Sequence, residues 1–226
     1  KELRNQLKDN REKANKWRKN ADINKFEELG KLYKKAGVSI YAYKPNFILG
    51  PKNTNEEISF AMKTAKALGA SHVTVELPKK DHSLRLGKLA EKNNIYVGYH
   101  GHEQQTPTWW DTALKQSRNN AINIDIGHYT AAGYSTNETI DFFNKKHQHI
   151  KSIHLKDRKN PKNGKENVVW GTGDTPIKEV LLQMKDKKYK FPATVEYEYK
   201  TPSDSNIINE VRKCVDYCKN ILESNT

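Results

Sequence analysis

Two short runs of β-branched residues end in side chains that can bind a metal ion or move a proton. The run Ile122-Asn-Ile-Asp-Ile-Gly-His128 carries Asp125, and Ile150-Lys-Ser-Ile-His-Leu-Lys-Asp157 carries His154. Runs of this composition are typical of buried strands, and packing alone gives such a strand no reason to end in a carboxylate or an imidazole. Strand ends and the loops after them build the active sites of parallel barrels, so we expect both residues at such a mouth.

Five consecutive predicted strands repeat one spacing, in which a small or polar residue stands two positions before an ionisable one. The pairs are Thr74 and Glu76, Gly98 and His100, Asn123 and Asp125, Ser152 and His154, and Thr194 and Glu196. Side chains at positions i and i+2 of a strand share a face, while the apolar residues between them face the helices. The spacing therefore predicts a ring at one end of the sheet, made of Glu76, His100, Asp125, His154 and Glu196.

Three carboxylates and two imidazoles in one ring need a cation among them. A divalent ion is the common solution, and mixed ligation by carboxylate and imidazole suits Mn, Zn, Co or Mg. The competing interpretation treats each residue as a solvated loop residue or as half of a satisfied ion pair. Because one register recurs in five strands, we favour the metal site.

Hydrophobic periodicity predicts the elements that position this ring. Residues 1–20 form a charged helical lead-in, and further helices are expected near 22–37, 54–68, 81–93, 109–118, 136–146, 177–184 and 203–222. Strands are expected at 38–44, 72–77, 95–100, 122–126, 150–155 and 193–199. Thr54 and Glu57 form a capping-box pattern at the start of one helix. This alternation predicts an α/β fold with a parallel sheet, of the TIM (β/α)8 type.

Six βα units are two fewer than a closed eight-stranded barrel contains. Either the first one or two strands are missing from the N-terminus because further units precede residue 1, or the sheet is an incomplete barrel covered by the lead-in helix. We favour the first, because the open apolar edge of a parallel sheet is hard to keep soluble. No Pro-, Gly- or Ser-rich stretch divides residues 1–226, which predicts a single domain.

The composition limits the classes of partner. The net charge is +13, with 40 Lys+Arg against 27 Asp+Glu, but only seven of the 40 are Arg, the better residue for binding phosphates and bases. We interpret the lysines as a solvated surface and expect no specific nucleic acid. Cys214 and Cys218 stand four apart on the last predicted helix and are expected in its core rather than in a disulfide.

The sequence contains no apolar run long enough to span a membrane, and we expect no membrane partner. A soluble protein is predicted, either cytoplasmic or periplasmic, because a signal peptide removed before residue 1 would be invisible. A homo-oligomer is compatible with the sequence.

Four motifs together carry a family resemblance: Asp125-Ile-Gly-His128, His154-Leu-Lys-Asp157, Trp170-Gly-Thr-Gly173 and Val195-Glu-Tyr-Glu198. With them the chain resembles the sugar phosphate isomerase/epimerase superfamily of xylose isomerase-like TIM barrels, which includes inosose dehydratase and endonuclease IV. Tyr99-His-Gly-His102 resembles the Tyr-His-Asn-His element of one branch, with Gly101 in place of Asn. The resemblance runs from about residue 38 to about residue 222.

The resemblance implies one divalent ion held by Glu, Asp, His and Glu from successive strand ends. Asp125, His154 and Glu196 match three of these positions. The first Glu normally comes from the strand that here ends in His100. We therefore expect Glu76, one strand earlier, as the fourth ligand, with His100 as its competitor.

The resemblance also implies proton transfer next to a sugar carbonyl through an enediolate, with the metal ion polarising the carbonyl. The candidate bases are His100, His102 and Glu198. Glu198 shares a face with Glu196 and could also replace it as a ligand. Lys156 could neutralise developing oxyanion charge or be one more surface lysine.

Three further residues are expected to contact the substrate. Tyr43 and Trp170 could stack on a sugar, although an aromatic residue at a barrel rim often only packs. His128 stands three residues after Asp125 and could also orient that ligand.

A carbohydrate-acting enzyme is the leading functional class, an isomerase or epimerase of a small sugar or keto-sugar. The alternative is a keto-sugar lyase or hydratase of the 3-keto-glycoside or inosose dehydratase type, because the same enediolate can lose a β-substituent. An endonuclease IV-like repair nuclease is less well supported, since Lys44 and Glu76 stand where that relative has histidine ligands. A sugar-binding protein without turnover is the third class, which an intact ring of ligands argues against.

Overall fold

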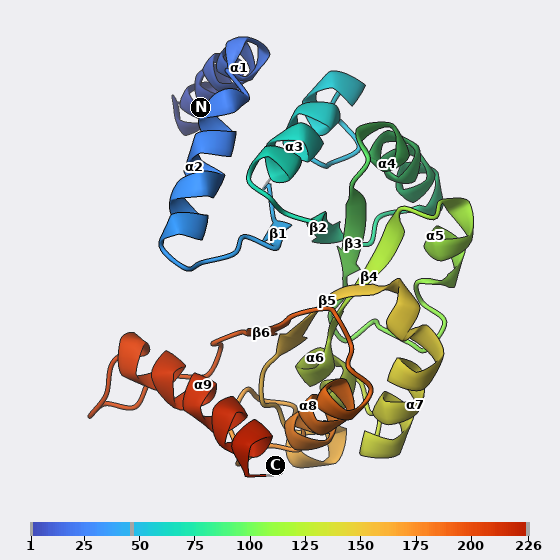
Figure 1. Cartoon of the computed structure of the whole chain (residues 1–226), viewed down its shortest axis with the longest axis vertical. Helices are drawn as coiled ribbons and strands as arrows, with labels where there is room; N and C mark the ends of the chain where they lie inside the picture. The colour runs from blue at the N-terminus through green and yellow to red at the C-terminus, as the bar shows by residue number, and fades with distance from the viewer. Residues whose placement is uncertain (1, 46–47, 225–226) are drawn as a thin grey trace. The chain divides into compact units, whose positions relative to one another are not determined.

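Helices and strands alternate along the computed structural model, which describes residues 2–45 and 48–224 (Figure 1). The strands are β1 (Ala42–Tyr43), β2 (His72–Glu76), β3 (Tyr96–His100), β4 (Asn120–Asp125), β5 (Ile150–Leu155) and β6 (Ala193–Val195). They lie in chain order in the sheet, and β1–β2, β4–β5 and β5–β6 pair in parallel. The predicted α/β fold with a parallel sheet is confirmed.

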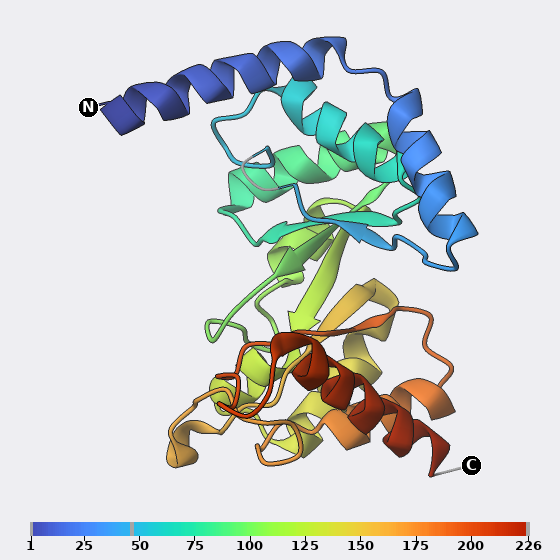
Figure 2. The same ribbon diagram turned by 90° about the vertical axis from the view of Figure 1, so that its left-hand side faces the viewer.

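Two helices precede the first strand, namely α1 (Glu2–Asn20) and α2 (Asn24–Lys35) (Figure 2). The others are α3 (Asn55–Ala67), α4 (Lys80–Asn93), α5 (Asp111–Gln116), α6 (Ile126–Ala131), α7 (Thr136–Lys146), α8 (Ile177–Asp186) and α9 (Ile207–Glu223), with short 3-10 helices η1 (His147–His149) and η2 (Pro161–Asn163). Helix α1 covers residues 2–20 of the charged helical lead-in predicted over residues 1–20.

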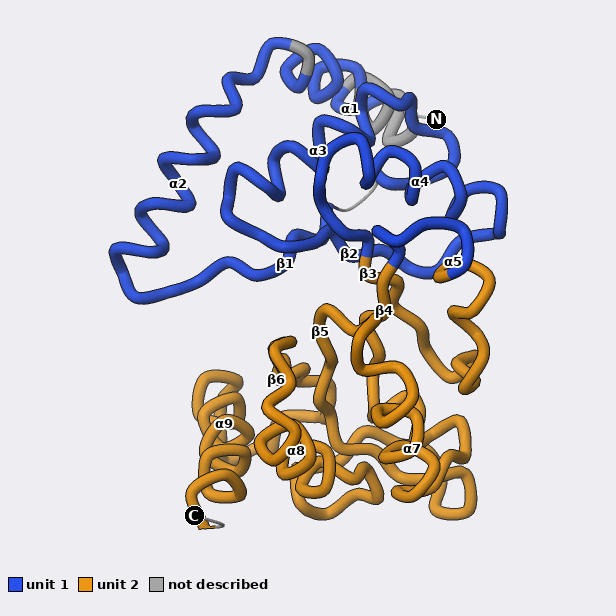
Figure 3. The backbone as a smooth tube through the Cα atoms, turned by 45° about the vertical axis from the view of Figure 1, so that its right-hand side comes forward, with its two compact units in different colours: residues 1–97, 115–120 blue, residues 98–114, 121–226 orange. Residues whose placement is uncertain are grey.

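The chain divides into two compact units, coloured separately in Figure 3. Unit 1 comprises residues 1–97 and 115–120, and unit 2 comprises residues 98–114 and 121–226. The chain passes between them within β3, within α5 and within β4. The assignment of residues 1–226 to a single domain stays a prediction.

Unit 1 is built on β1 and β2, with α3 packed on β2 and α4 packed on α3. Ile58, Met62, Leu86 and Val73 are fully buried in its core. The predicted capping box at Thr54 is confirmed, since its hydroxyl accepts a hydrogen bond from the backbone N–H of Glu57. Helix α3 thus begins where the sequence predicts.

Unit 2 contains β5, β6 and most of β4, and its helices pack in succession, α7 against α8 and α8 against α9 (Figure 1). Its core is aromatic, with the rings of Trp110 and Tyr129 lying 5.5 and 5.6 Å from that of Phe142. Helix α6 contacts β5, and α9 contacts β6. Unit 2 therefore packs helices and an aromatic core around β5 and most of β4.

Four predicted elements differ in extent or kind. The strand expected over 38–44 is only Ala42–Tyr43, and the strand expected over 193–199 ends at Val195. The last helix begins at Ile207 instead of near residue 203. The stretch after Asp125, expected as a loop, is helix α6, because the Asp125 carboxylate caps its first turn.

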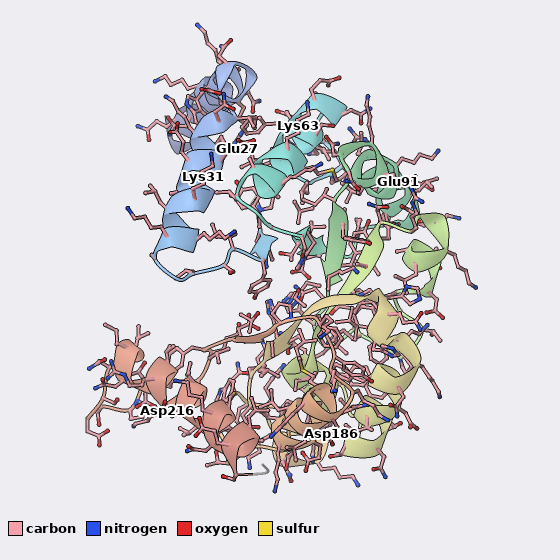
Figure 4. All side chains as sticks on the ribbon, in the orientation of Figure 1. Glu27, Lys31, Lys63, Glu91, Asp186 and Asp216 are labelled. Carbon is pink, nitrogen blue, oxygen red and sulfur yellow. The ribbon has the colours of Figure 1, made fainter. Side chains whose placement is uncertain are left out.

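The charged side chains labelled in Figure 4 all lie exposed on helices. They are Glu27 and Lys31 on α2, Lys63 on α3, Glu91 on α4, Asp186 on α8 and Asp216 on α9. They fit the interpretation of the many charges as a solvated surface. Among the described helices, none is both long and apolar enough to cross a membrane.

Candidate active site

The ends of β4 and β5 bring two predicted ligands side by side. In the parallel register Asp125 pairs with His154, and Asn123 pairs with Ser152. On the next strand His154 pairs with Thr194, two residues before Glu196. The spacing found in the sequence thus places the three side chains at neighbouring strand ends. His154 Nδ1 lies 3.0 Å from Glu196 Oε2 and 4.0 Å from Asp125 Oδ2.

A buried lysine lies among the carboxylates. Lys156, the second residue after His154, is 1% exposed, which excludes the surface-lysine alternative. Its Nζ lies 3.1 Å from Asp125 Oδ2, 3.0 Å from Glu196 Oε2 and 2.5 Å from Glu198 Oε2. Nζ donates a hydrogen bond to Glu198 and forms ion pairs with Asp125 and Glu196.

Burial and charge shift the pKa values of this cluster in opposite directions. Burial raises the pKa of Asp125 well above its ordinary range, against the lowering effect of the Lys156 charge. Burial also opposes ionisation of Glu196, but hydrogen bonds with His154 and Asp125 outweigh it and hold the pKa of Glu196 low. Burial would lower the pKa of Lys156, but Asp125 and the two glutamates raise it instead. The ammonium of Lys156 therefore stays charged.

Gly127, in the first turn of α6, makes room for this lysine. A Cβ atom at position 127 would lie 2.3 Å from Lys156 Cγ and 2.8 Å from its carbonyl oxygen. Only glycine avoids that collision. In the Asp125-Ile-Gly-His128 motif, Asp125 therefore caps α6 and Gly127 allows the close approach of Lys156. His128 adds an imidazole next to that lysine.

Four histidines line the same region of unit 2. The ring of His100 lies 4.8 Å from that of His154 and 5.0 Å from that of His102. The His128 ring lies 4.7 Å from that of His102. His100 is buried, His128 and His154 are partly exposed, and His102 is exposed, so His102 is the most accessible of the four to a substrate.

Both ring nitrogens of His128 face cations. Arg158 Nη1 lies 2.6 Å from Nδ1, and Lys156 Nζ lies 3.0 Å from Nε2. Burial lowers the pKa of His128 to about 3, with added effects from the Lys156 and Arg158 charges, so its ring is neutral at physiological pH. The backbone N–H of His128, rather than its ring, contacts Asp125, donating to Oδ1 at 2.8 Å.

Asp157 holds the loop of the Trp170-Gly-Thr-Gly173 motif. Its Oδ2 accepts hydrogen bonds from the backbone N–H groups of Gly171 and Gly173, at 2.8 and 2.9 Å, and its Oδ1 accepts one from Thr175 at 3.3 Å. Gly171 has a φ of +87°, and a Cβ at Gly173 would lie 2.0 Å from Asp157 Oδ1. Both glycines are thus required by the clamp. Trp170 is buried beside it, edge-on to Tyr217 at 6.2 Å.

Gly101 of the Tyr99-His-Gly-His102 element lies against Trp109. A Cβ at position 101 would lie 2.4 Å from the ring of Trp109. The indole of Trp109 therefore fills the space into which an asparagine side chain would extend.

Two predicted site residues belong to unit 1. Glu76 ends β2 and is part of an ion pair with Lys44, at 3.8 Å between Oε1 and Nζ. Tyr43 lies on β1 and is partly buried. The roles of Glu76 as fourth ligand and of Tyr43 as a sugar contact stay predictions.

The residues of unit 2 fit a divalent ion. One ligand atom from each of His100, Asp125 and His154 lies within 4.8 Å of the others. Asp125 Oδ2 is buried with no aligned hydrogen-bond donor, although Lys156 Nζ lies 3.1 Å away. Carboxylate oxygen and imidazole nitrogen are suitable ligands for Mn, Zn, Co or Mg. Lys156 supplies a positive charge at the same oxygens and would compete with an ion there.

Four residues of the site make contacts that the sequence pattern does not indicate. They are Glu103, Gln105, Asp157 and Arg158. Gln105 hydrogen-bonds the backbone of Asp125 with both ends of its amide, at 3.0 and 3.4 Å. Asp157 lies inside the His154-Leu-Lys-Asp157 motif. The available signal for its role was the pair of glycines in the Trp170-Gly-Thr-Gly173 motif, which it binds. Nothing in the spacing of Glu103 or Gln105 marks them, because their partners are distant in sequence.

Comparison with known proteins gives matches over most of the chain. A family model described as the xylose isomerase-like TIM barrel matches residues 6–218. A sugar phosphate isomerase/epimerase structure from Parabacteroides distasonis is 17% identical, with a TM-score of 0.62, over 85% of this chain and 76% of that one. No curated protein matches in sequence.

Two further structures show the same fold. D-psicose 3-epimerase from Clostridium cellulolyticum, solved with D-tagatose, is 14% identical with a TM-score of 0.65, over 89% of this chain and 85% of that one. A xylose isomerase-like TIM barrel protein from Mycobacterium smegmatis, in complex with magnesium, is 15% identical with a TM-score of 0.59. The match covers 90% of this chain and 79% of that one. The predicted TIM-barrel type of fold and the family resemblance are confirmed.

Proposed function

Because the chain belongs to the xylose isomerase-like TIM-barrel family, we propose that it is a divalent-metal-dependent isomerase or epimerase of a small sugar. The observation that carries the proposal is the convergence of Asp125, His154 and Glu196 from neighbouring strand ends. Structural relatives named as an epimerase and as a magnesium complex support it. Glu76 is proposed as the fourth ligand, with His100 as its competitor.

When bound, the ion would polarise the sugar carbonyl and stabilise negative charge on its oxygen. The protein's own residues would move the proton. His102 and Glu198 are the exposed candidate bases, and the Glu198 carboxylate, 2.5 Å from Lys156 Nζ, is held in place by that ammonium. One of them would take the proton from the carbon next to the carbonyl and return it to form the product.

Lys156 would act as an electrostatic partner in this reaction. Its ammonium is buried and fixed by three carboxylates, so it needs little reorganisation to stabilise an oxygen that gains negative charge. Trp170 and Tyr43 are proposed as aromatic contacts for the sugar, and His128 as a polar contact.

A keto-sugar lyase or hydratase is the second candidate. The observation that favours it is the His100–His102 pair, whose rings lie edge-on with centroids 5.0 Å apart. One neutral and one protonated imidazole could remove a proton and deliver it to a leaving oxygen.

The test is a substrate panel with the metal-stripped protein, supplied with Mn, Mg, Co or Zn. Free and phosphorylated ketoses report isomerisation or epimerisation, and 3-keto-glycosides report release of the aglycone. We expect metal-dependent turnover of a ketose, lost in Glu196→Gln and retained in Glu179→Gln, an exposed glutamate of α8. Aglycone release without ketose turnover would select the lyase. Incision of abasic DNA instead would overturn both.

A further inference from the structure

Arg158 is a buried arginine whose side chain joins three segments of unit 2. Its Nη1 lies 2.6 Å from His128 Nδ1, and its Nη2 donates to Glu103 Oε1 at 2.9 Å. Nε and Nη2 both donate to the backbone carbonyl of Lys165, at 3.0 and 2.6 Å. Only 8% of the residue is exposed. Burial and these hydrogen bonds therefore fix the guanidinium. Its contact with His128 is partly buried, not one between exposed side chains.

The contact determines which nitrogen of His128 carries the proton. A guanidinium group only donates hydrogen bonds and does not lose its proton in proteins. The Nδ1 atom that faces it must therefore be the acceptor. A neutral imidazole has one acceptor nitrogen and one N–H, so the proton is left on Nε2. A cation faces each ring nitrogen, which opposes a further positive charge on the ring and keeps it neutral.

Lys156 competes for the same ring, because its Nζ lies 3.0 Å from Nε2 and can also only donate. The ring cannot accept from both cations. The ammonium donates to Glu198 Oε2 at 2.5 Å and forms ion pairs with oxygens of Asp125 and Glu196 at 3.1 and 3.0 Å. The contact of Arg158 with the ring is the shorter one, 2.6 Å against 3.0 Å, and Lys156 keeps its carboxylate partners without His128, so Arg158 retains Nδ1.

We infer that Arg158 is a positioning residue that fixes His128 as the Nε2–H tautomer. His128 Nε2–H and Lys156 Nζ then form two donors side by side, which require an oxygen acceptor between them. A carbonyl or hydroxyl oxygen of the substrate satisfies both donors, whereas a ligand group that only donates does not. The identity of this oxygen as a sugar oxygen rests on the proposed function, but the tautomer does not.

The test is NMR of the free protein labelled with ¹⁵N-histidine, with no metal and no substrate. The chemical shifts of the ring nitrogens distinguish the two tautomers, and His128→Gln assigns the signal. We expect the Nε2–H form in the wild type. In Arg158→Met the proton should move to Nδ1, because Lys156 is then the only donor facing the ring. Lys156→Met should keep the Nε2–H form.

Lys165→Met is the matched control. It removes the second cation on Glu103, whose Oε2 lies 3.1 Å from Lys165 Nζ, and leaves the backbone carbonyl that holds Arg158. The His128 tautomer should not change. An Nδ1–H ring in the wild type, or an unchanged tautomer in Arg158→Met, would overturn the inference. If Arg158→Met fails to fold, the wild type and Lys156→Met still decide it.

Kinetics then separate this inference from the proposed function. If a sugar substrate is found, Arg158→Met should lower kcat/KM about tenfold to a hundredfold, mainly through KM, as expected for one misdirected hydrogen bond. If no sugar is turned over and the tautomer is as expected, the proposed function fails while the role of Arg158 stands.

Discussion

Asp125 and His154 are register partners on the parallel strands β4 and β5, with Asp125 Oδ2 4.0 Å from His154 Nδ1. The backbone pairing, not a flexible loop, fixes this relationship. Each residue is also held from outside the pair, Asp125 by the N–H of His128 and His154 by Glu196. Ligands fixed in this way need little rearrangement to hold an ion.

The first prediction concerns these ligands. Asp125→Asn and His154→Ala should each lower bound divalent metal from about one equivalent to less than about a tenth, because a mononuclear site rarely survives loss of a ligand. Elemental analysis after reloading and gel filtration measures it. Asp186→Asn, an exposed carboxylate on α8, is the control that should keep the metal. Full metal content in both ligand variants would place the ion elsewhere.

The second prediction concerns the competition between Lys156 and the ion. Lys156→Met removes a positive charge 3.0 to 3.1 Å from oxygens of Asp125 and Glu196. Metal affinity should therefore rise by about tenfold or more, while turnover falls by about a hundredfold. Isothermal titration with Mn measures the affinity, and Lys178→Met on the exposed face of α8 is the control. Weaker metal binding in Lys156→Met would mean that the lysine supports the ion instead of competing with it.

The third prediction concerns the clamp made by Asp157. Asp157→Asn replaces an acceptor oxygen with an amide that cannot serve all three N–H donors, so the loop should open more often. We expect amide hydrogen exchange at Gly171 and Gly173 to accelerate by about tenfold or more, equivalent to about 1.4 kcal/mol. Asp174→Asn is the control, because Asp174 Oδ2 accepts from Asn160 and Asn163 instead. Exchange that accelerates equally in both variants would show general loosening and contradict the clamp.

The fourth prediction concerns Cys218 on α9, a free thiol whose pKa burial raises to about 11. The thiolate is the reactive form, so a raised pKa means less thiolate at mildly alkaline pH. Alkylation of Cys218 should be more than about 100-fold slower in the folded than in the unfolded protein. Because the folded pKa lies above the unfolded one, this contribution to stability is present below about pH 8.5 and is lost as pH rises toward 11.

Peptide mapping after timed alkylation measures the reactivity of Cys218. Cys214, which is fully buried, should react even more slowly in the folded state. Rapid alkylation of Cys218 in the folded protein would contradict the packing of α9.

Local periodicity was enough to predict most of the fold. Helix α7 and strand β5 have the expected bounds, because their apolar spacing and flanking residues agree with their packing. Strand β6 is shorter than expected, because its alternating sequence continues past Val195 while the pairing with β5 stops. Helix α6 was missed because the residue that caps it, Asp125, is also the last residue of β4, so no separate cap precedes the helix.

The candidate site was predictable only in part. The period-two spacing identified Asp125, His154 and Glu196, because strand geometry converts sequence spacing directly into a shared face. Lys156 was predicted as a candidate for neutralising oxyanion charge, but its ion pairs with Asp125, Glu196 and Glu198 were not predictable, because a single lysine among many carries no periodic signal. The same holds for Arg158, whose partners Glu103 and His128 are 55 and 30 residues away.

The site of unit 2 is proposed to remove a proton from the carbon next to a sugar carbonyl. Deuterium incorporation at that carbon, followed by NMR in D₂O with Mn and a panel of ketoses, tests it most directly, because isomerase, epimerase and lyase all begin with this step. We predict incorporation into at least one ketose with the wild type and about a hundredfold less or none with Glu196→Gln. No incorporation into any of them, with any of Mn, Mg, Co or Zn, would contradict the claim.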